Sequence, residues 1–116
     1  MSAFSDVRRA EIAVRAHHQC EYCRLPTRGQ VATFPIDHII PRSAGGTTEP
    51  GNLALTCPHC NAAKWTAVTA HDPISCEVVP LVHPRRDLWD EHFAWSAERR
   101  GDIVGITPIG RATINA

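Results

Sequence analysis

Two pairs of cysteines constrain this chain more than any other feature of its sequence. Cys20 and Cys23 form one Cys-x2-Cys turn, and Cys57 and Cys60 form a second. Each two-residue gap lets both sulfurs of a turn face one ion, and four thiolates around zinc make a closed structural site. We therefore predict a structural Zn²⁺ bound by all four cysteines. A redox Cys-x-x-Cys motif, an iron site with the same ligands and unrelated buried thiols are the alternatives that the spacing leaves open.

The chain is expected to work in a reducing compartment, which favours metal binding by paired cysteines. Residues 1–9 carry charges and lack the apolar stretch of a secretory signal, so we expect a cytoplasmic protein. Thiols stay reduced there, and paired cysteines then more often bind metal than form disulfides. No apolar run approaches the roughly 18 residues of a membrane span, so no membrane partner is expected. The fifth cysteine, Cys76, is predicted to be a small buried apolar side chain.

Length and charge set limits on stability and on partners. The 116 residues suffice for one domain with a modest core, which a bound ion would help to stabilise. The formal net charge is zero, whereas proteins that bind duplex DNA usually carry a basic excess. Residues 1–64 hold seven Lys/Arg and five Asp/Glu, and residues 65–116 hold five and seven. The half with the cysteine pairs is therefore slightly basic.

Hydrophobic periodicity and turn signals predict a mixture of helices and strands. Ser5 is the expected N-cap of a helix that runs to about His17. Short strands are expected at 31–36 and at 39–40, and a further helix from about 61 to 68. The first half of the chain should therefore fold as α+β.

Residues 70–116 are predicted to form a C-terminal extension that packs on the preceding part of a single domain. Strands are expected at 78–82 and 103–106, with a short helix or extended segment over 87–95. Large aromatic side chains dominate burial in small domains. The aromatic residues of the extension are therefore predicted to be core rather than a base-stacking surface: Trp89, Phe93 and Trp95.

Four polar residues lie in a suggestive order around the cysteine pairs. Asp37 and His38 are adjacent between the pairs, Asn52 precedes the second pair, and Asn61 directly follows it. A lone histidine is usually structural, and asparagine near turns usually caps them, so each residue alone indicates little. An imidazole, with an unperturbed pKa of about 6.5, is the side chain best suited to activate a water near neutral pH. The order of the four residues therefore matters more than any one of them.

The elements Asp-His, Gly-Gly, Asn-Leu and Cys-Asn-x-x-Lys occur in that order between residues 37 and 64. Together with the cysteine pairs, they resemble the HNH, or ββα-metal, nuclease family. The resemblance covers residues 20 to about 68, less than half of the chain. It implies an α+β fold: a ββα-metal unit with a structural four-cysteine zinc, an N-terminal helix and the C-terminal extension, all within one domain over 1–116.

The resemblance also implies an activity, namely metal-dependent hydrolysis of phosphodiester bonds in nucleic acid, with DNA favoured over RNA. His38 would be the general base, and Asn52 would tie the following loop to the strands and keep His38 in orientation. Asp37 and Asn61 would bind the catalytic ion. The all-histidine version of the family has a further metal-binding histidine where this chain has Trp65. Water and phosphate oxygens would then complete a shell that suits Mg²⁺, Mn²⁺ or another divalent ion.

Arg42 and Lys64 are candidate phosphate contacts, because both lie close in sequence to the implied catalytic positions. Simple exposed charges are the equal alternative for both. Double-stranded DNA is the expected partner, and a homodimer would place two active sites on opposite strands. Two rival functions stay open: a catalytically inactive zinc module that binds nucleic acid or protein, and a rubredoxin-like iron or redox protein.

Overall fold

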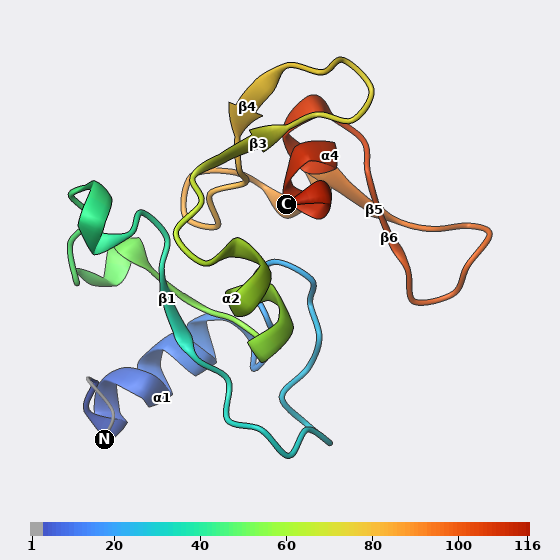
Figure 1. The fold of residues 1–116 in the computed structure, drawn as a ribbon. Coiled ribbons are helices and arrows are strands. Elements are labelled where there is room, and N and C mark those ends of the chain that lie inside the picture. The colour runs from blue at the N-terminus through green and yellow to red at the C-terminus, as the bar shows by residue number, and fades with distance from the viewer. Residues whose placement is uncertain (1–3) are drawn as a thin grey trace. The chain divides into compact units, whose positions relative to one another are not determined.

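A computed structural model describes residues 4–116, and in it the chain forms two compact units, Met1–Ala63 and Lys64–Ala116. The elements of the first unit, the last of which ends one residue beyond it, are α1 (Asp6–Arg15), β1 (Ile36–His38), β2 (Leu53–Leu55) and α2 (Pro58–Lys64) (Figure 1). Two single-turn 3-10 helices, η1 (Arg42–Ala44) and η2 (Pro50–Asn52), lie in the loop between the strands. The fold is α+β, as predicted.

The helix α1 begins where its sequence signal lies. The Ser5 side chain accepts a hydrogen bond of 3.1 Å from the Arg8 amide, which confirms the predicted N-cap. The helix ends at Arg15, two residues before the predicted end. His17 and His18 both adopt left-handed φ angles, of 57° and 54°, which an α-helix cannot contain.

The strands β1 and β2 form an antiparallel hairpin in which Asp37 lies opposite Ala54. The strand predicted at 31–36 is wrong, because β1 begins only at the last residue of that range. Val31 is fully exposed there, so it has no buried face to favour pairing. The strand predicted at 39–40 is also wrong, because these residues form a bend after β1, although the Ile39 amide still donates to the Asn52 carbonyl (2.8 Å).

The core of the first unit lies between α1, the hairpin and the cysteine turns. Its buried members are Ile12, Ala16, Cys20, Tyr22, Phe34, Leu53, Leu55 and Cys57. The Arg15 guanidinium adds a polar tether, since it donates to the carbonyl oxygens of Pro50 (2.8 Å) and Leu53. This tether holds the last turn of α1 against the start of β2.

The helix α2 differs from the predicted helix at both of its ends. It begins at Pro58, three residues earlier than predicted, because the second cysteine turn is itself helical. Proline suits a first helical position, where no amide donor is needed. It ends at Lys64 rather than at residue 68, because Trp65 takes a left-handed φ of 44°.

The second unit contains two hairpins and two helices. Its elements are β3 (Thr69–His71), β4 (Val78–Pro80), α3 (Trp89–His92), β5 (Phe93–Trp95), β6 (Ile103–Gly105) and α4 (Pro108–Asn115). The strands predicted from residues 78 and 103 begin there, whereas β3 has no counterpart among the predicted elements. The helix α4 packs against the β3–β4 hairpin and against β6 (Figure 1). Packing of the extension on the first half stays a prediction.

A buried ion pair joins α4 to the loop that follows β3. The Asp72 carboxylate is fully buried and accepts hydrogen bonds from Arg111 Nε (2.8 Å) and Nη2 (2.9 Å). The Ser75 hydroxyl donates a third, of 2.7 Å. The Arg111 guanidinium holds the pKa of the Asp72 carboxyl well below its usual range. This carboxylate therefore stays charged inside the unit.

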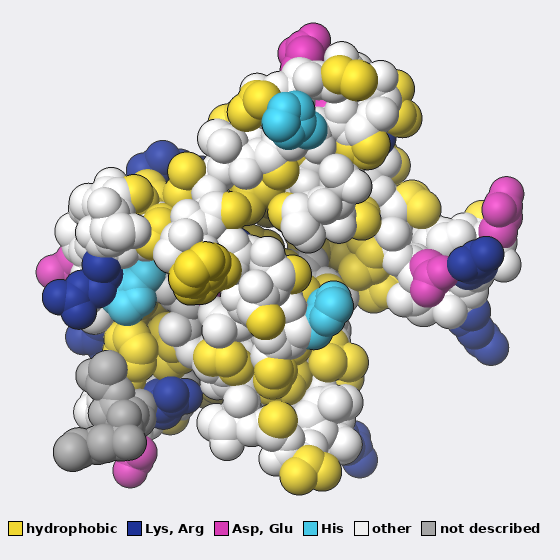
Figure 2. Space-filling model, viewed as in Figure 1, with side chains coloured by type: hydrophobic (Ala, Val, Ile, Leu, Met, Phe, Trp, Pro, Cys, Tyr) yellow, Lys and Arg dark blue, Asp and Glu magenta, His cyan; other side chains and the backbone are white. Residues whose placement is uncertain are grey.

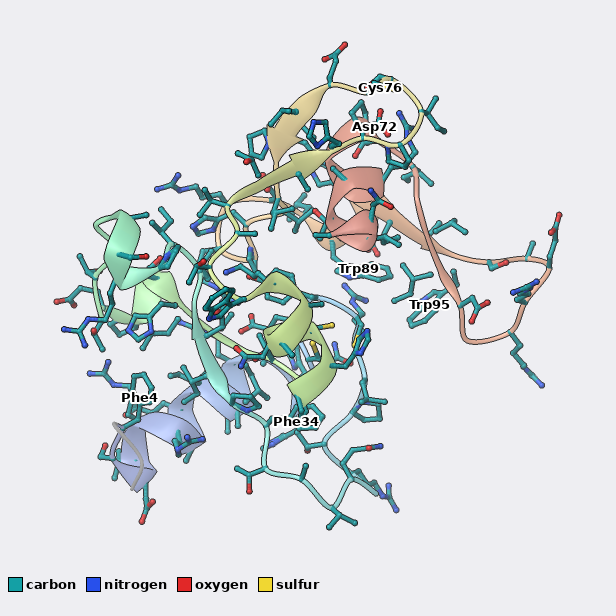
Figure 3. The ribbon with its side chains drawn as sticks, viewed as in Figure 1. Phe4, Phe34, Asp72, Cys76, Trp89 and Trp95 are labelled. Carbon is teal, nitrogen blue, oxygen red and sulfur yellow. The ribbon has the colours of Figure 1, made fainter. Side chains whose placement is uncertain are left out.

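The aromatic residues of the second unit form a small cluster rather than a continuous core. Trp89 lies 5.3 Å from Phe93 and 5.5 Å from Trp95 between ring centroids (Figure 3). Phe93 is buried as predicted, but Trp95 is 51% exposed, so its prediction as core is wrong. Trp95 pairs with Ile103, at the end of the hairpin farther from the start of α4.

The hairpin tips of the second unit face solvent. Cys76 lies in the exposed β3–β4 turn with a left-handed φ of 64°, so its prediction as a buried residue is wrong. Charged side chains of both signs gather at the β5–β6 tip (Figure 2). Across residues 4–116, none of the helices is long and apolar enough to cross a membrane.

Candidate metal centre and catalytic site

Four cysteine sulfurs gather beside α2 in the first unit. The Sγ atoms of Cys20, Cys23, Cys57 and Cys60 all lie within 4.8 Å of one another. Those of Cys23 and Cys57 are 3.7 Å apart. A zinc tetrahedron with bonds of about 2.3 Å has sulfur–sulfur edges of about 3.8 Å. The cluster therefore fits a structural zinc ion, as the spacing of the cysteines predicts.

Local backbone geometry makes each cysteine turn. In the first turn, the Arg24 amide donates to the Cys20 carbonyl (2.9 Å), and Arg24 takes a left-handed φ of 65°. In the second, the Cys60 amide lies 3.4 Å from the Cys57 sulfur, and the Asn61 amide donates to the Cys57 carbonyl. Amide hydrogens directed at sulfur favour the thiolate, which is the metal-binding form.

The thiols are not independent of one another. Hydrogen bonds from Cys23 and Cys60 hold the pKa of the Cys20 thiol well below its ordinary value. The same interactions with Cys20 raise the pKa of the thiols of Cys23 and Cys60. These three thiols therefore cannot all ionise without added positive charge. A divalent cation supplies that charge, and thiolate binding to metal is accompanied by proton release.

The first cysteine turn is also joined to the hairpin. The Glu21 amide donates to the Leu55 carbonyl (2.9 Å), and the Leu55 amide donates to the Glu21 carboxylate (2.8 Å). These two bonds satisfy both the amide and the carbonyl of Leu55, the last residue of β2. The turn thus occupies the position that a third strand would take. Neither spacing nor periodicity in the sequence indicates this role of Glu21.

Asp37 lies in the middle of β1 and is 7% exposed. Tyr22, inside the first cysteine turn, donates its hydroxyl hydrogen to Asp37 Oδ2 over 3.3 Å. Burial raises the pKa of the Tyr22 phenol, and the negative charge of Asp37 raises it further. Tyr22 therefore acts as a donor here. It was missed at the sequence level, where its place between two cysteines was the only available signal.

His38 is the last residue of β1 and is half-buried. Its Nε2 lies 3.2 Å from the Thr48 hydroxyl, and its ring lies 6.0 Å from that of Phe4 between centroids. Neighbouring strand residues point to opposite faces of a sheet. The contacts agree, since Asp37 meets the cysteine turn whereas His38 meets the loop before β2 and the residues before α1.

Asn52 holds the long loop that follows β1. Its Oδ1 accepts from the Ile40 amide (2.9 Å), and its Nδ2 donates to the carbonyls of Ile40 (2.9 Å) and Thr47 (2.7 Å). Gly46 lies against this contact, because a Cβ atom there would overlap the Ile40 carbonyl. Asn52 is 8% exposed, so these backbone groups depend on it. The loop carries Thr48, and with it the contact to His38.

The other predicted site residues differ in exposure. Arg42 is exposed in η1. Asn61 is half-buried in α2, immediately after Cys60. Lys64, the last residue of α2, is only 7% exposed, so its ammonium group is not presented openly to solvent. That Asp37 and Asn61 share an ion, and that Arg42 and Lys64 contact phosphate, stay predictions.

Comparison with protein families identifies one segment of the chain. The model described as HNH endonuclease matches residues 20–66. The matched segment begins at the first cysteine and ends two residues beyond α2. It therefore contains both cysteine turns, the hairpin and the Asp37–His38 pair. No curated protein matches the chain.

Proposed function

Because residues 20–66 belong to the HNH endonuclease family, we propose that this chain is a metal-dependent endonuclease that hydrolyses phosphodiester bonds, with DNA as its substrate. One observation carries the proposal above all. The adjacent Asp37 and His38 lie on a hairpin that is held by the four-cysteine cluster and by the loop between β1 and β2, which Asn52 anchors. A preorganised acid–base and ion-binding pair is what this chemistry requires.

We propose that His38 is the general base. The proposed tautomer has the hydrogen on Nε2, which donates to the Thr48 hydroxyl, and the lone pair on Nδ1, which accepts a proton from the attacking water. The contact with Thr48 limits rotation of the ring. Asn52 is a positioning residue in this scheme, because it anchors the loop that carries Thr48.

Asp37 and Asn61 are the proposed ligands of the catalytic ion. Carboxylate and amide oxygens are ligands for hard cations, so the set suits Mg²⁺ or Mn²⁺. When bound, a divalent ion stabilises the charge that develops on the phosphate and on the leaving oxygen.

The substrate is proposed to be held by few cationic contacts. The formal charge of the chain is zero, so binding should depend less on salt than in strongly basic proteins. Arg42 is exposed in η1, close in sequence to His38, and is the first candidate for a phosphate contact. Lys64 would need to become exposed before it could act in the same way. A homodimer would allow cleavage of both strands, which linear plasmid product would report.

One observation favours a second function, a catalytically inactive zinc module that binds nucleic acid. The Asp37 carboxylate is nearly buried and already bonded to Tyr22, so it offers little open surface to an incoming ion. This alternative predicts that the wild type binds DNA without nicking it under any metal.

The deciding experiment is a supercoiled-plasmid assay with Mg²⁺, Mn²⁺, Ni²⁺ or Zn²⁺ added to the zinc-loaded protein. We expect nicking by the wild type and its loss in His38→Ala, because the base is removed. His71→Ala is the matched control, since it removes an exposed histidine of the second unit. DNA ligase should reseal the nicks, because the expected products are the 5′-phosphate and 3′-hydroxyl ends that ligase joins. Equal nicking by His38→Ala and the wild type would refute the role of His38.

A further inference from the structure

Tyr22 occupies an unusual place between the two metal-related parts of the first unit. It lies inside the first cysteine turn, between Cys20 and Cys23, whose sulfurs belong to the four-cysteine cluster. Its hydroxyl reaches out of that turn to the Asp37 carboxylate on β1. One side chain therefore connects the cluster to a proposed ligand of the catalytic ion.

The contact is sheltered from water. Tyr22 and Asp37 are each 7% exposed, and the hydroxyl donates to Oδ2 over 3.3 Å. A buried carboxylate oxygen that loses a donor is not readily satisfied by solvent. The hydrogen bond therefore restricts rotation of the carboxylate.

The backbone that carries Tyr22 is itself restrained. The preceding residue, Glu21, exchanges two hydrogen bonds with Leu55 of β2. Leu55 follows Ala54, the residue paired with Asp37 across the hairpin. The cysteines on either side are held in the cluster. The position of the Tyr22 hydroxyl is therefore set by the metal cluster and by the same hairpin that carries Asp37.

We propose that Tyr22 is a positioning residue that transmits the geometry of the four-cysteine cluster to Asp37 and so orients this carboxylate for the catalytic ion. This inference rests on the proposed function, because it needs Asp37 to be an ion ligand. Residues that hydrogen-bond to metal ligands typically change metal affinity 10–100-fold when they are removed. Loss of the Tyr22 hydroxyl should weaken binding of the catalytic ion without loss of zinc.

The test is a titration of the full zinc-loaded chain with Mn²⁺ in the absence of nucleic acid. Electron paramagnetic resonance measures the free Mn²⁺ and so gives the dissociation constant. Tyr22→Phe removes only the hydroxyl, and we expect its Mn²⁺ dissociation constant to rise about 10–100-fold with one zinc retained per chain. Thr56→Val is the matched control, because it removes another buried hydroxyl, bonded to the Pro35 carbonyl over 3.1 Å. Its Mn²⁺ affinity should equal that of the wild type.

A spectroscopic readout adds to the binding data. Tyr22 is the only tyrosine in the chain, so the tyrosine Raman doublet reports on its hydroxyl alone. We expect Asp37→Ala to change this doublet. An unchanged doublet would overturn the proposed hydrogen bond in solution.

The outcomes separate the two proposals. If Asp37→Ala loses Mn²⁺ but Tyr22→Phe binds it as tightly as the wild type, the coupling is overturned and the catalytic site stands. If Asp37→Ala retains full Mn²⁺ affinity, the proposed site and the coupling both fail. Loss of zinc in Tyr22→Phe would show that the Tyr22 hydroxyl has a general role in folding, and the coupling would be overturned. The coupling would also be overturned if Thr56→Val lost as much Mn²⁺ affinity as Tyr22→Phe.

Discussion

Replacement of Asn52 by alanine should destabilise the loop that follows β1. The change removes three hydrogen bonds, two to Ile40 and one to Thr47, and leaves three backbone groups without these partners. Each such bond contributes about 1 kcal/mol net, so the free energy of unfolding should fall by about 3 kcal/mol. Because stabilities are commonly 5–15 kcal/mol, this loss is large but need not prevent folding.

Two measurements check the prediction for Asn52→Ala. Urea unfolding followed by far-UV circular dichroism should show a lower midpoint with an unchanged slope. Exchange of the Ile40 amide, which donates to Asn52 Oδ1, should accelerate about a hundredfold if local opening accounts for the loss. Asn115→Ala, an exposed change in the second unit, should alter stability by less than about 0.5 kcal/mol.

The nicking rate of the Asn52 variants tests the same reasoning at the level of activity. Asn52→Ala should also cut more slowly, because Thr48 and then His38 lose their restraint. Asn52→Asp should be no better, since a carboxylate would face the carbonyl oxygens to which Nδ2 now donates. Unchanged stability together with an unchanged Ile40 exchange rate in the alanine variant would refute the reasoning.

Three further predictions concern metals and pH. Chelation of the cluster ion, or Cys57→Ser, should unfold or loosen the first unit, since structural zinc contributes on the order of 10 kcal/mol; retained circular dichroism after verified zinc removal would contradict this. Asp37→Ala should abolish nicking and keep one zinc per chain by elemental analysis, and zinc loss would mean that the two sites are not separate. The folded-state pKa of Asp72 is lowered by Arg111, so its stabilisation is present above the unfolded-state value of about 3.9 and is lost as pH falls through the folded-state value. Tryptophan-monitored melting should show a steeper acid destabilisation in the wild type than in Asp72→Asn, and identical pH profiles would count against the ion pair.

The features that sequence reasoning predicted correctly depend on local signals. Two-residue gaps place the sulfurs of each cysteine turn, so the four-cysteine cluster could be inferred from spacing alone. Ser5 caps α1 through a bond to a residue three positions away, which is also a local pattern. The HNH endonuclease model matches residues 20–66, the segment that contains these short motifs.

The features that it missed depend on residues far apart in the chain. Strand pairing between residues 36–38 and 53–55 crosses a long loop, and of the apparent strand at 31–36 only Ile36 pairs with another strand. Exposure of Trp95 follows from its place on a two-stranded hairpin rather than from its own hydrophobicity. Tyr22 reaches Asp37 across 15 positions by one hydroxyl, which no periodicity would reveal.

The tether made by Arg15 constrains the identity of the donor residue but not the identities of the two acceptor residues. Its guanidinium binds the carbonyl oxygens of Pro50 and Leu53, and every amino acid carries such an oxygen. Evolutionary drift at the two acceptor positions would therefore leave the tether intact, provided that the backbone kept its path. Lysine in place of Arg15 has a single ammonium group and lacks the planar fork that spans two acceptors. A contact of this kind should leave no covarying partner, so coevolution methods would overlook a bond that joins α1 to the β1–β2 hairpin.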